Sequence, residues 1–170
     1  QFDVAFVGHE LPGERTRLLH LIRETFPKHF IGQRYREDMA RTYSAARITF
    51  NRSVKNDINM RVFEALACGS LLLTNDLTDN GQAELFQDGI HLATYGSDEE
   101  LLDKARFYLK HEREREQLAK AGLHHARAKH TYRQRMETLL EAVGKASRPK
   151  AVPAKDSAYY EFSRPDVLEL

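Results

Sequence analysis

The chain is poor in cysteine and lacks any long run of apolar residues. Its 170 residues include one cysteine, Cys68, so no intramolecular disulfide can form, which is typical of a protein in the reducing cytoplasm. No apolar run reaches the roughly 20 residues that a transmembrane helix needs, and no secretory signal is visible. We therefore expect a cytoplasmic protein without a transmembrane segment, in which Cys68 is a small buried hydrophobic residue.

Neither sign of charge dominates the sequence. The 26 lysine and arginine residues nearly balance the 25 aspartate and glutamate residues, and the net charge is +1. A dedicated nucleic-acid binder carries a marked basic excess, so nucleic acid is not an expected partner. The glycine pattern GxGxxG is also absent, so a dinucleotide cofactor is not supported. Hydrophobic residues make up 41% of the chain, enough for one domain with a core.

Short apolar runs alternate with helical patterns along most of the chain. Strands are predicted at residues 2–7, 29–32, 47–51, 70–74 and 90–94. Helices are predicted at residues 13–26, 35–46, 59–68, 81–87 and 112–143. A further helix is predicted to follow the capping box that Ser97 and Glu100 form. This alternation predicts an α/β fold, a Rossmann-like parallel sheet with helices on both faces.

Several residues suited to ligand binding stand where the predicted strands end. Gly8, Asn51, Asn75 and Asp76 occupy these positions, and ligands of parallel sheets bind beyond the carboxyl ends of the strands. A glycine at position 8 lets the backbone approach a ligand closely. His9 follows it and is a candidate ligand neighbour or base, because histidine titrates near neutral pH.

Residues 56–76 form the most informative segment, which reads as polar loop, short helix, glycine stop and buried strand. A helix that begins after a polar loop offers free backbone N–H groups to an anion. Glu64 lies within the apolar run of this helix and places a carboxylate near the same opening. The alternative is a core helix on which Arg61 and Glu64 form an ion pair three residues apart.

The pattern NxRxFEALACGxxLLT at residues 59–74 resembles the group 1 glycosyltransferases, specifically their spore-maturation-protein-like branch. The resemblance continues through residues 83–109 and covers about residues 2–143. It implies the GT-B fold, with this chain as the C-terminal domain that binds a nucleotide-diphosphate sugar without a metal. The implied partner is an N-terminal, acceptor-binding domain of the parent chain, and we expect poor activity without it.

The resemblance also implies roles for residues in and before the 59–68 helix. Glu64 matches the carboxylate that holds the donor's ribose, and a carboxylate can accept hydrogen bonds from two vicinal hydroxyls. The backbone at Asn59, Met60 and Arg61 is expected to lie against the diphosphate, at the N-terminus of the helix. The side chains that are candidates to stabilise the leaving diphosphate are Arg61, Arg52 and Lys55.

One position departs from the family pattern. Many relatives carry a glutamate eight residues before the ribose-binding one, where it contacts the donor sugar. Here that position is Asn56, with Asp57 beside it. Either Asp57 takes over the contact, the sugar contact differs, or activity is altered. This departure favours a non-catalytic nucleotide-binding or scaffolding module as one alternative function. A nucleotide-sugar epimerase, which shares the fold, is the other.

Composition divides the C-terminal part of the chain. We expect the nucleotide-sugar-binding domain at residues 1–143, a linker at 144–157 and the start of a further element at 158–170. The last segment resembles the lead-in to a class I methyltransferase domain, and both chain ends indicate a piece of a longer protein. The basic run at residues 120–135 is interpreted as a solvated helix face. The alternative is a surface that contacts an anionic membrane or nucleic acid. The spacing of its histidines does not fit a zinc site.

Overall fold

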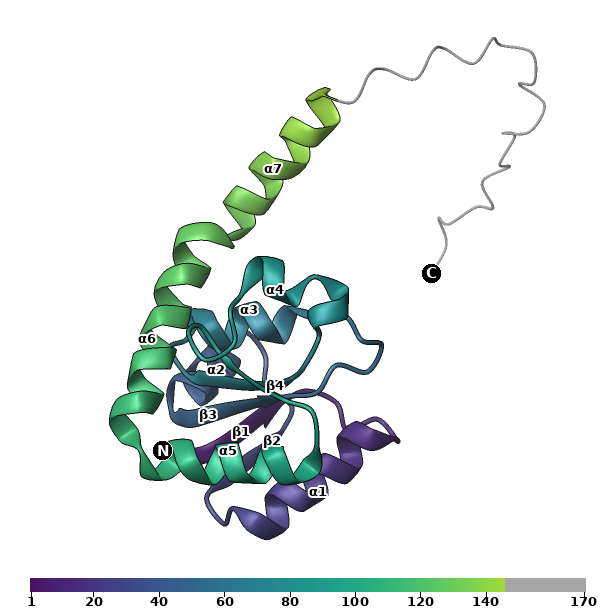
Figure 1. Cartoon of the computed structure of the whole chain (residues 1–170). Coiled ribbons are helices and arrows are strands. Elements are labelled where there is room, and N and C mark those ends of the chain that lie inside the picture. Colours follow the sequence, from purple (N-terminus) through teal and green to yellow (C-terminus); the bar gives the residue numbers. More distant parts are fainter. Residues whose placement is uncertain (146–170) are drawn as a thin grey trace, which may run out of the picture. The chain divides into compact units, whose positions relative to one another are not determined.

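The computed structural model describes residues 1–145 (Figure 1). The chain divides into a sheet unit, Gln1–Gln134, and a second unit that begins at Arg135. The described part of the second unit belongs to helix α7 (Tyr132–Lys145). The helix therefore includes the first two residues of the predicted linker, and the rest of residues 144–170 lies outside the described residues. The division of the chain near residue 143 remains a prediction.

Five parallel strands form one sheet in the order β2-β1-β3-β4-β5. The strands are β1 (Phe2–Val7), β2 (His29–Gly32), β3 (Ala46–Asn51), β4 (Leu71–Asn75) and β5 (Ala93–Tyr95). After β2 the chain returns past β1 to build the other half of the sheet. The carboxyl ends of β1 and β3 therefore flank the point where the order reverses, where ligands of such sheets bind.

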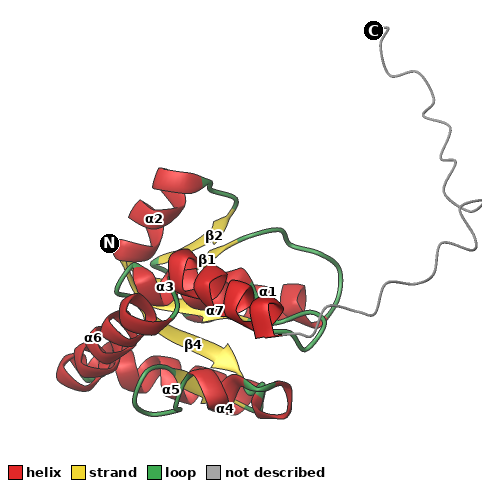
Figure 2. Cartoon of the chain, turned by 90° about the horizontal axis from the view of Figure 1, so that it is seen from above, coloured by secondary structure: helices red, strands yellow, loops and turns green. Residues whose placement is uncertain are grey.

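Helices cover both faces of the sheet, which confirms the predicted fold class (Figure 1, Figure 2). Helices α1 and α5 pack on one face, and α3 with the second half of α6 packs on the other. The helices are α1 (Glu14–Thr25), α2 (Arg36–Ser44), α3 (Met60–Ala67), α4 (Gln82–Leu85), α5 (Asp98–Lys110), α6 (Glu112–Lys129) and α7. None of these described helices is long and apolar enough to cross a membrane.

Strand β4 explains why the sheet needs helices on both sides. All five of its residues are buried. Leu71 and Leu73 join the core under α1 and α5, whereas Leu72 between them joins the core under α3. Because side chains alternate across a strand, a continuous apolar run is fully buried only when both faces of the sheet are covered.

Two predicted boundaries are wrong. The fifth strand begins at Ala93 rather than at residue 90, because the Asp88 side chain accepts the Thr94 N–H at 2.7 Å and residues 87–92 form a turn. The helix predicted at residues 112–143 is two helices, since α6 ends at Lys129 and α7 begins at Tyr132. The capping box is half formed, because Ser97 Oγ accepts the Glu100 N–H at 3.2 Å while the Glu100 carboxylate accepts from Gly96.

Candidate functional site

An open pocket of about 640 Å³ lies at the carboxyl ends of β1 and β3. Its walls come from the loop after β1, the first turn of α1, the loop after β3 and the first turns of α3. The lining residues are Leu11, Arg15, Val54, Lys55, Asp57, Ile58, Asn59, Met60, Arg61 and Glu64. Six of the predicted site residues are thereby brought together at the reversal point of the sheet.

The N-terminus of α3 opens into this pocket. Asn59 is the N-cap residue, with extended backbone, and no side chain caps the helix by a hydrogen bond among the described residues. The first N–H groups of a helix have no partner within it, and they carry the positive end of the helix dipole. The pocket therefore presents the backbone donors at the start of α3, and the contact of the Asn59–Arg61 stretch with a diphosphate remains a prediction.

Arg61 bridges the two central strands. Its Nε donates to the Val7 carbonyl at the end of β1, at 2.9 Å, and Nη1 donates to Asn51 Oδ1 at the end of β3, at 2.8 Å. The guanidinium lies over the Phe6 ring, 4.5 Å from its centroid. Gly8 leaves the space that this requires, because a Cβ at that position would come within 3.0 Å of Nη2. Gly8 thus accommodates Arg61 rather than lining the pocket.

Arg15 is a site residue that sequence reasoning missed. Its Nη2 donates to the His9 carbonyl at 2.7 Å, and its guanidinium lies 5.6 Å from the same Phe6 ring that Arg61 covers. Its Nε is buried without a hydrogen-bond partner among the described residues. Burial, and then the charge of Arg61, lowers the pKa of Arg15. A helical arginine gives no sequence signal that distinguishes this position from an exposed one.

No carboxylate of the described residues forms an ion pair with Arg15 or Arg61. Two guanidiniums therefore meet at one aromatic ring without a balancing charge. Guanidinium groups present fixed forks of N–H donors that suit phosphate oxygens. Together with the α3 N-terminus, the pair can bind a group with several negative oxygens, such as a diphosphate.

Glu64 lines the same pocket and is half-buried. Its carboxylate makes no hydrogen bond or ion pair within the described residues, so the alternative of an ion pair with Arg61 is wrong. Tyr43 lies beneath, with its hydroxyl 3.5 Å from the Val7 carbonyl, and burial raises the pKa of this phenol to about 12. A free carboxylate at a pocket mouth is available to accept hydrogen bonds from ligand hydroxyls.

The loop after β3 is held by one buried and two partly buried hydrogen bonds. Asn75 Oδ1, at the end of β4, accepts the Ser53 N–H at 2.9 Å. Ser53 Oγ in turn donates to Asp57 Oδ1 at 2.6 Å and accepts the Asp57 N–H at 2.7 Å. Lys55 and Asp57 thereby line the pocket from a fixed loop, and their contacts with a donor remain predictions.

Besides Gly8, three predicted site residues do not line the pocket. Arg52 forms an ion pair with Glu14 of α1 and does not line the pocket. Asn56 lines a separate hollow of about 130 Å³ with Asp76, Leu77 and Asp79, and its backbone has a positive φ of 55°. The exposed His9 contributes its backbone carbonyl to Arg15, and its side chain does not line the pocket.

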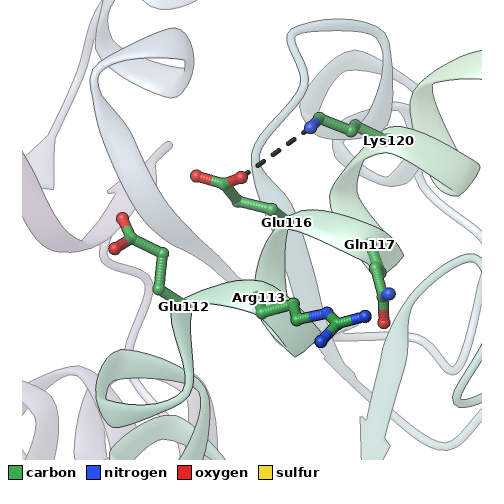
Figure 3. Close-up of a pocket in the computed structure, with 5 residues that line it drawn as sticks. All are labelled: Glu112, Arg113, Glu116, Gln117 and Lys120. Carbon is green, nitrogen blue, oxygen red and sulfur yellow. Dashed lines mark ion pairs between the residues drawn. The ribbon is translucent and has the colours of Figure 1, made fainter.

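A second pocket, of about 590 Å³, lies on α6 alone (Figure 3). Its side chains are Glu112, Arg113, Glu116, Gln117 and Lys120, with an ion pair between Glu116 and Lys120 at 3.7 Å. Residues from a single helix do not converge on a ligand from several directions. Except for Lys120, these residues precede the basic run at residues 120–135, which is predicted to be a solvated helix face.

The second half of the basic run differs from that prediction. His125 Nε2 donates to the Leu85 carbonyl at 2.9 Å, and its ring stacks on His91 with centroids 4.1 Å apart. His130 packs against Phe86, with ring centroids 4.8 Å apart. These histidines belong to a packed cluster between α6 and the α4 region, because their rings cover the aromatic core residue Phe86. The prediction of a fully solvated face is therefore wrong for His125 and His130.

Protein stability is expected to fall below neutral pH because of His91. Burial, and then the nearby His125, lowers the pKa of His91 from its ordinary value of 6.5. The unfolded chain then takes up this proton at a higher pH than the folded one, so stability decreases as the pH falls below about 6.5. Thermal unfolding between about pH 7.5 and pH 5.5 measures the slope.

The matched variant is His91→Asn, which keeps a side-chain acceptor for the Gln87 N–H that Nδ1 now receives at 3.1 Å. Its unfolding temperature should change less over this pH range. Equal slopes for the two proteins would show that His91 does not cause the loss.

The chain matches the family model described as glycosyl transferase-like over residues 4–141. No curated protein matches it. Among solved structures, HepE from Anabaena in complex with UDP has a TM-score of 0.66 at 14% identity, over 83% of this chain and 48% of that one. Sucrose-phosphate synthase from Thermosynechococcus elongatus has a TM-score of 0.59 at 21% identity, over 84% of this chain and 39% of that one.

A glycosyltransferase from Rickettsia africae gives a similar result, with a TM-score of 0.63 at 18% identity, over 86% of this chain and 41% of that one. This chain thus spans less than half the length of each of these three structures. At these identities, the structural likeness establishes a shared fold.

Proposed function

Because the chain belongs to the glycosyl transferase-like family, we propose that its sheet unit binds the nucleoside diphosphate portion of a nucleotide-sugar donor. Family membership agrees with the resemblance of residues 59–74, while the spore-maturation-protein-like branch remains a prediction. The reaction that we propose for the whole protein is transfer of the donor's sugar to an acceptor. We assign acceptor binding and the remaining reacting groups to a further domain, which would correspond to the part of the structural relatives that this chain does not span.

The observation that carries the proposal is the uncompensated pair Arg15 and Arg61 beside the free N-terminus of α3. Both guanidiniums lie over Phe6, and both line the pocket. Cleavage of a nucleotide-sugar donor places negative charge on the departing diphosphate. Fixed positive groups that face this charge stabilise the transition state, which is a role that a bound metal performs in other enzymes.

Glu64 is assigned to the ribose. Its carboxylate lies on α3, C-terminal to the backbone groups that face the diphosphate, and it is unpaired within the described residues. Each carboxylate oxygen can accept a hydrogen bond from one of the two vicinal hydroxyls, an arrangement that a neutral side chain cannot supply. Uridine is the first nucleoside to test, since HepE is crystallised with UDP and with UDP-glucose.

The proposal is tested by calorimetric titration of the 170-residue chain with UDP, GDP and ADP, and with uridine as the control lacking phosphates. We expect at least one diphosphate to bind, to bind about tenfold or more tightly than its nucleoside, and to weaken as salt is raised. Failure of all three diphosphates to bind at millimolar concentration would contradict the proposal.

The longer protein separates the two alternative functions. Binding of a nucleotide sugar without sugar transfer or turnover would identify a non-catalytic module. The position of Asn56, outside the main pocket, is the observation that favours this alternative. Conversion of a nucleotide sugar to its epimer without any acceptor, detected by product analysis, would identify an epimerase.

A further inference from the structure

Asn51 is a fully buried polar residue at the carboxyl end of β3. Its Oδ1 accepts from Arg61 Nη1 at 2.8 Å and from Asn59 Nδ2 at 3.3 Å. Its Nδ2 donates to Thr74 Oγ1 of β4 at 2.9 Å, and its carbonyl accepts from the Tyr95 hydroxyl at 2.9 Å. One residue therefore connects β3, β4 and β5 to both the N-cap and the first turn of α3.

The partners of Asn51 fix the direction of its amide. Arginine has only donors, so the atom of Asn51 that faces Arg61 must be the carbonyl oxygen. The amide nitrogen must then face Thr74, and Asn59 must point its own nitrogen toward Asn51. This leaves Asn59 Oδ1 buried without a hydrogen-bond partner among the described residues. The orientation follows from hydrogen-bond chemistry alone.

The neutral charge of Asn51 matters as much as its geometry. Arg61 is half-buried, and an arginine removed from water is most often held by a carboxylate, which would cancel its charge. Here the two acceptors of Arg61 are a backbone carbonyl and an amide oxygen. Arg61 is thereby held in place while its positive charge remains available to a ligand in the pocket.

We propose that Asn51 is the positioning residue of the diphosphate pocket, which orients Arg61 and the start of α3 without neutralising the guanidinium. This inference rests on the proposed function for the identity of the ligand. The contact between Asn51 and Arg61 does not depend on it, so the two are tested separately.

The first measurement follows Arg61 itself, without nucleotide. In a nitrogen–proton NMR spectrum, the Arg61 Nε–H signal is assigned by its loss in Arg61→Lys. We expect this signal to be protected from exchange in the native protein and to shift or broaden in Asn51→Ala. An unchanged Arg61 signal in Asn51→Ala would overturn the positioning role, whether or not nucleotides bind.

Thr49→Val is the matched control. Thr49 is also fully buried on β3, and its Oγ1 donates to Ser70 Oγ of the neighbouring segment at 2.9 Å. The variant removes a buried side-chain hydrogen bond between the same two chain segments, without touching Arg61. A role limited to sheet stability predicts the same effect for Thr49→Val and Asn51→Ala.

The second measurement is calorimetric titration with UDP at two salt concentrations. We expect Asn51→Ala and Asn51→Asp to bind about tenfold or more weakly, and Thr49→Val to bind within about twofold of the native protein. Asn51→Asp should also lose much of the salt dependence, because its carboxylate neutralises Arg61. Native affinity and salt dependence in Asn51→Asp would overturn the inference, whereas failure of UDP, GDP and ADP alike to bind the native protein contradicts only the proposed function.

Discussion

Replacing Gly122 by alanine is expected to lower the free energy of unfolding by about 2–3 kcal/mol. Gly122 lies in the middle of α6, where the helix crosses over α3 and the turn before β5. A Cβ at this position would come within 3.0 Å of the His91 carbonyl oxygen and 2.7 Å from Leu66 Cδ2. Leu66 can change rotamer, but the carbonyl belongs to the backbone of a hydrogen-bonded turn. Relief therefore requires α6 to move away from α3 and from the turn before β5.

Gly144→Ala is the matched comparison for this prediction. Gly144 is also helical, in α7, and a Cβ there meets no atom within 4 Å. Alanine removes conformational freedom from the unfolded chain, so the free energy of unfolding of this variant should rise by about 0.5 kcal/mol or slightly more. Urea unfolding of both variants measures the difference. A Gly122→Ala protein as stable as Gly144→Ala would show that α6 does not pack as tightly as the structure has it.

The sheet could be predicted because its strands are local apolar runs with clear stops. The strands at residues 2–7 and 29–32 have the predicted bounds, since Gly8 and Gly32 end them. The fifth strand was misplaced because Ile90 continues the apolar run in sequence, although its side chain is 51% exposed on a turn. What decides this boundary is the Asp88 contact to Thr94, which a hydropathy pattern does not contain.

The site was predicted where one short segment carries several of its groups. Residues 59–64 supply the helix N-terminus, Arg61 and Glu64 from consecutive turns of one helix. Arg15 was missed as a site residue, and Asn51 was placed only at a strand end without a role, because the roles of both depend on contacts across the sheet, to Phe6 and to Arg61. Arg52 was predicted to be a site residue but does not line the pocket, because its guanidinium pairs with Glu14, which is far away in the sequence.

Replacing Glu64 by alanine is expected to weaken UDP binding by about 1.5–3 kcal/mol, which is a ten- to hundredfold loss of affinity. The carboxylate is half-buried at the pocket mouth and has no competing partner within the described residues. Its full hydrogen-bonding capacity is therefore available to the ribose. Glu116→Ala is the control for a lost surface carboxylate, because Glu116 lies on α6 beside Lys120 and outside this pocket.

The contact is identified by pairing this variant with 2′-deoxy-UDP. If Glu64 accepts from both ribose hydroxyls, the native protein binds 2′-deoxy-UDP about tenfold more weakly than UDP, and Glu64→Ala binds the two ligands equally. The coupling between variant and ligand then reports one hydrogen bond, free of any general effect of the substitution on the pocket. Full discrimination between the two ligands by Glu64→Ala would assign the ribose to another residue.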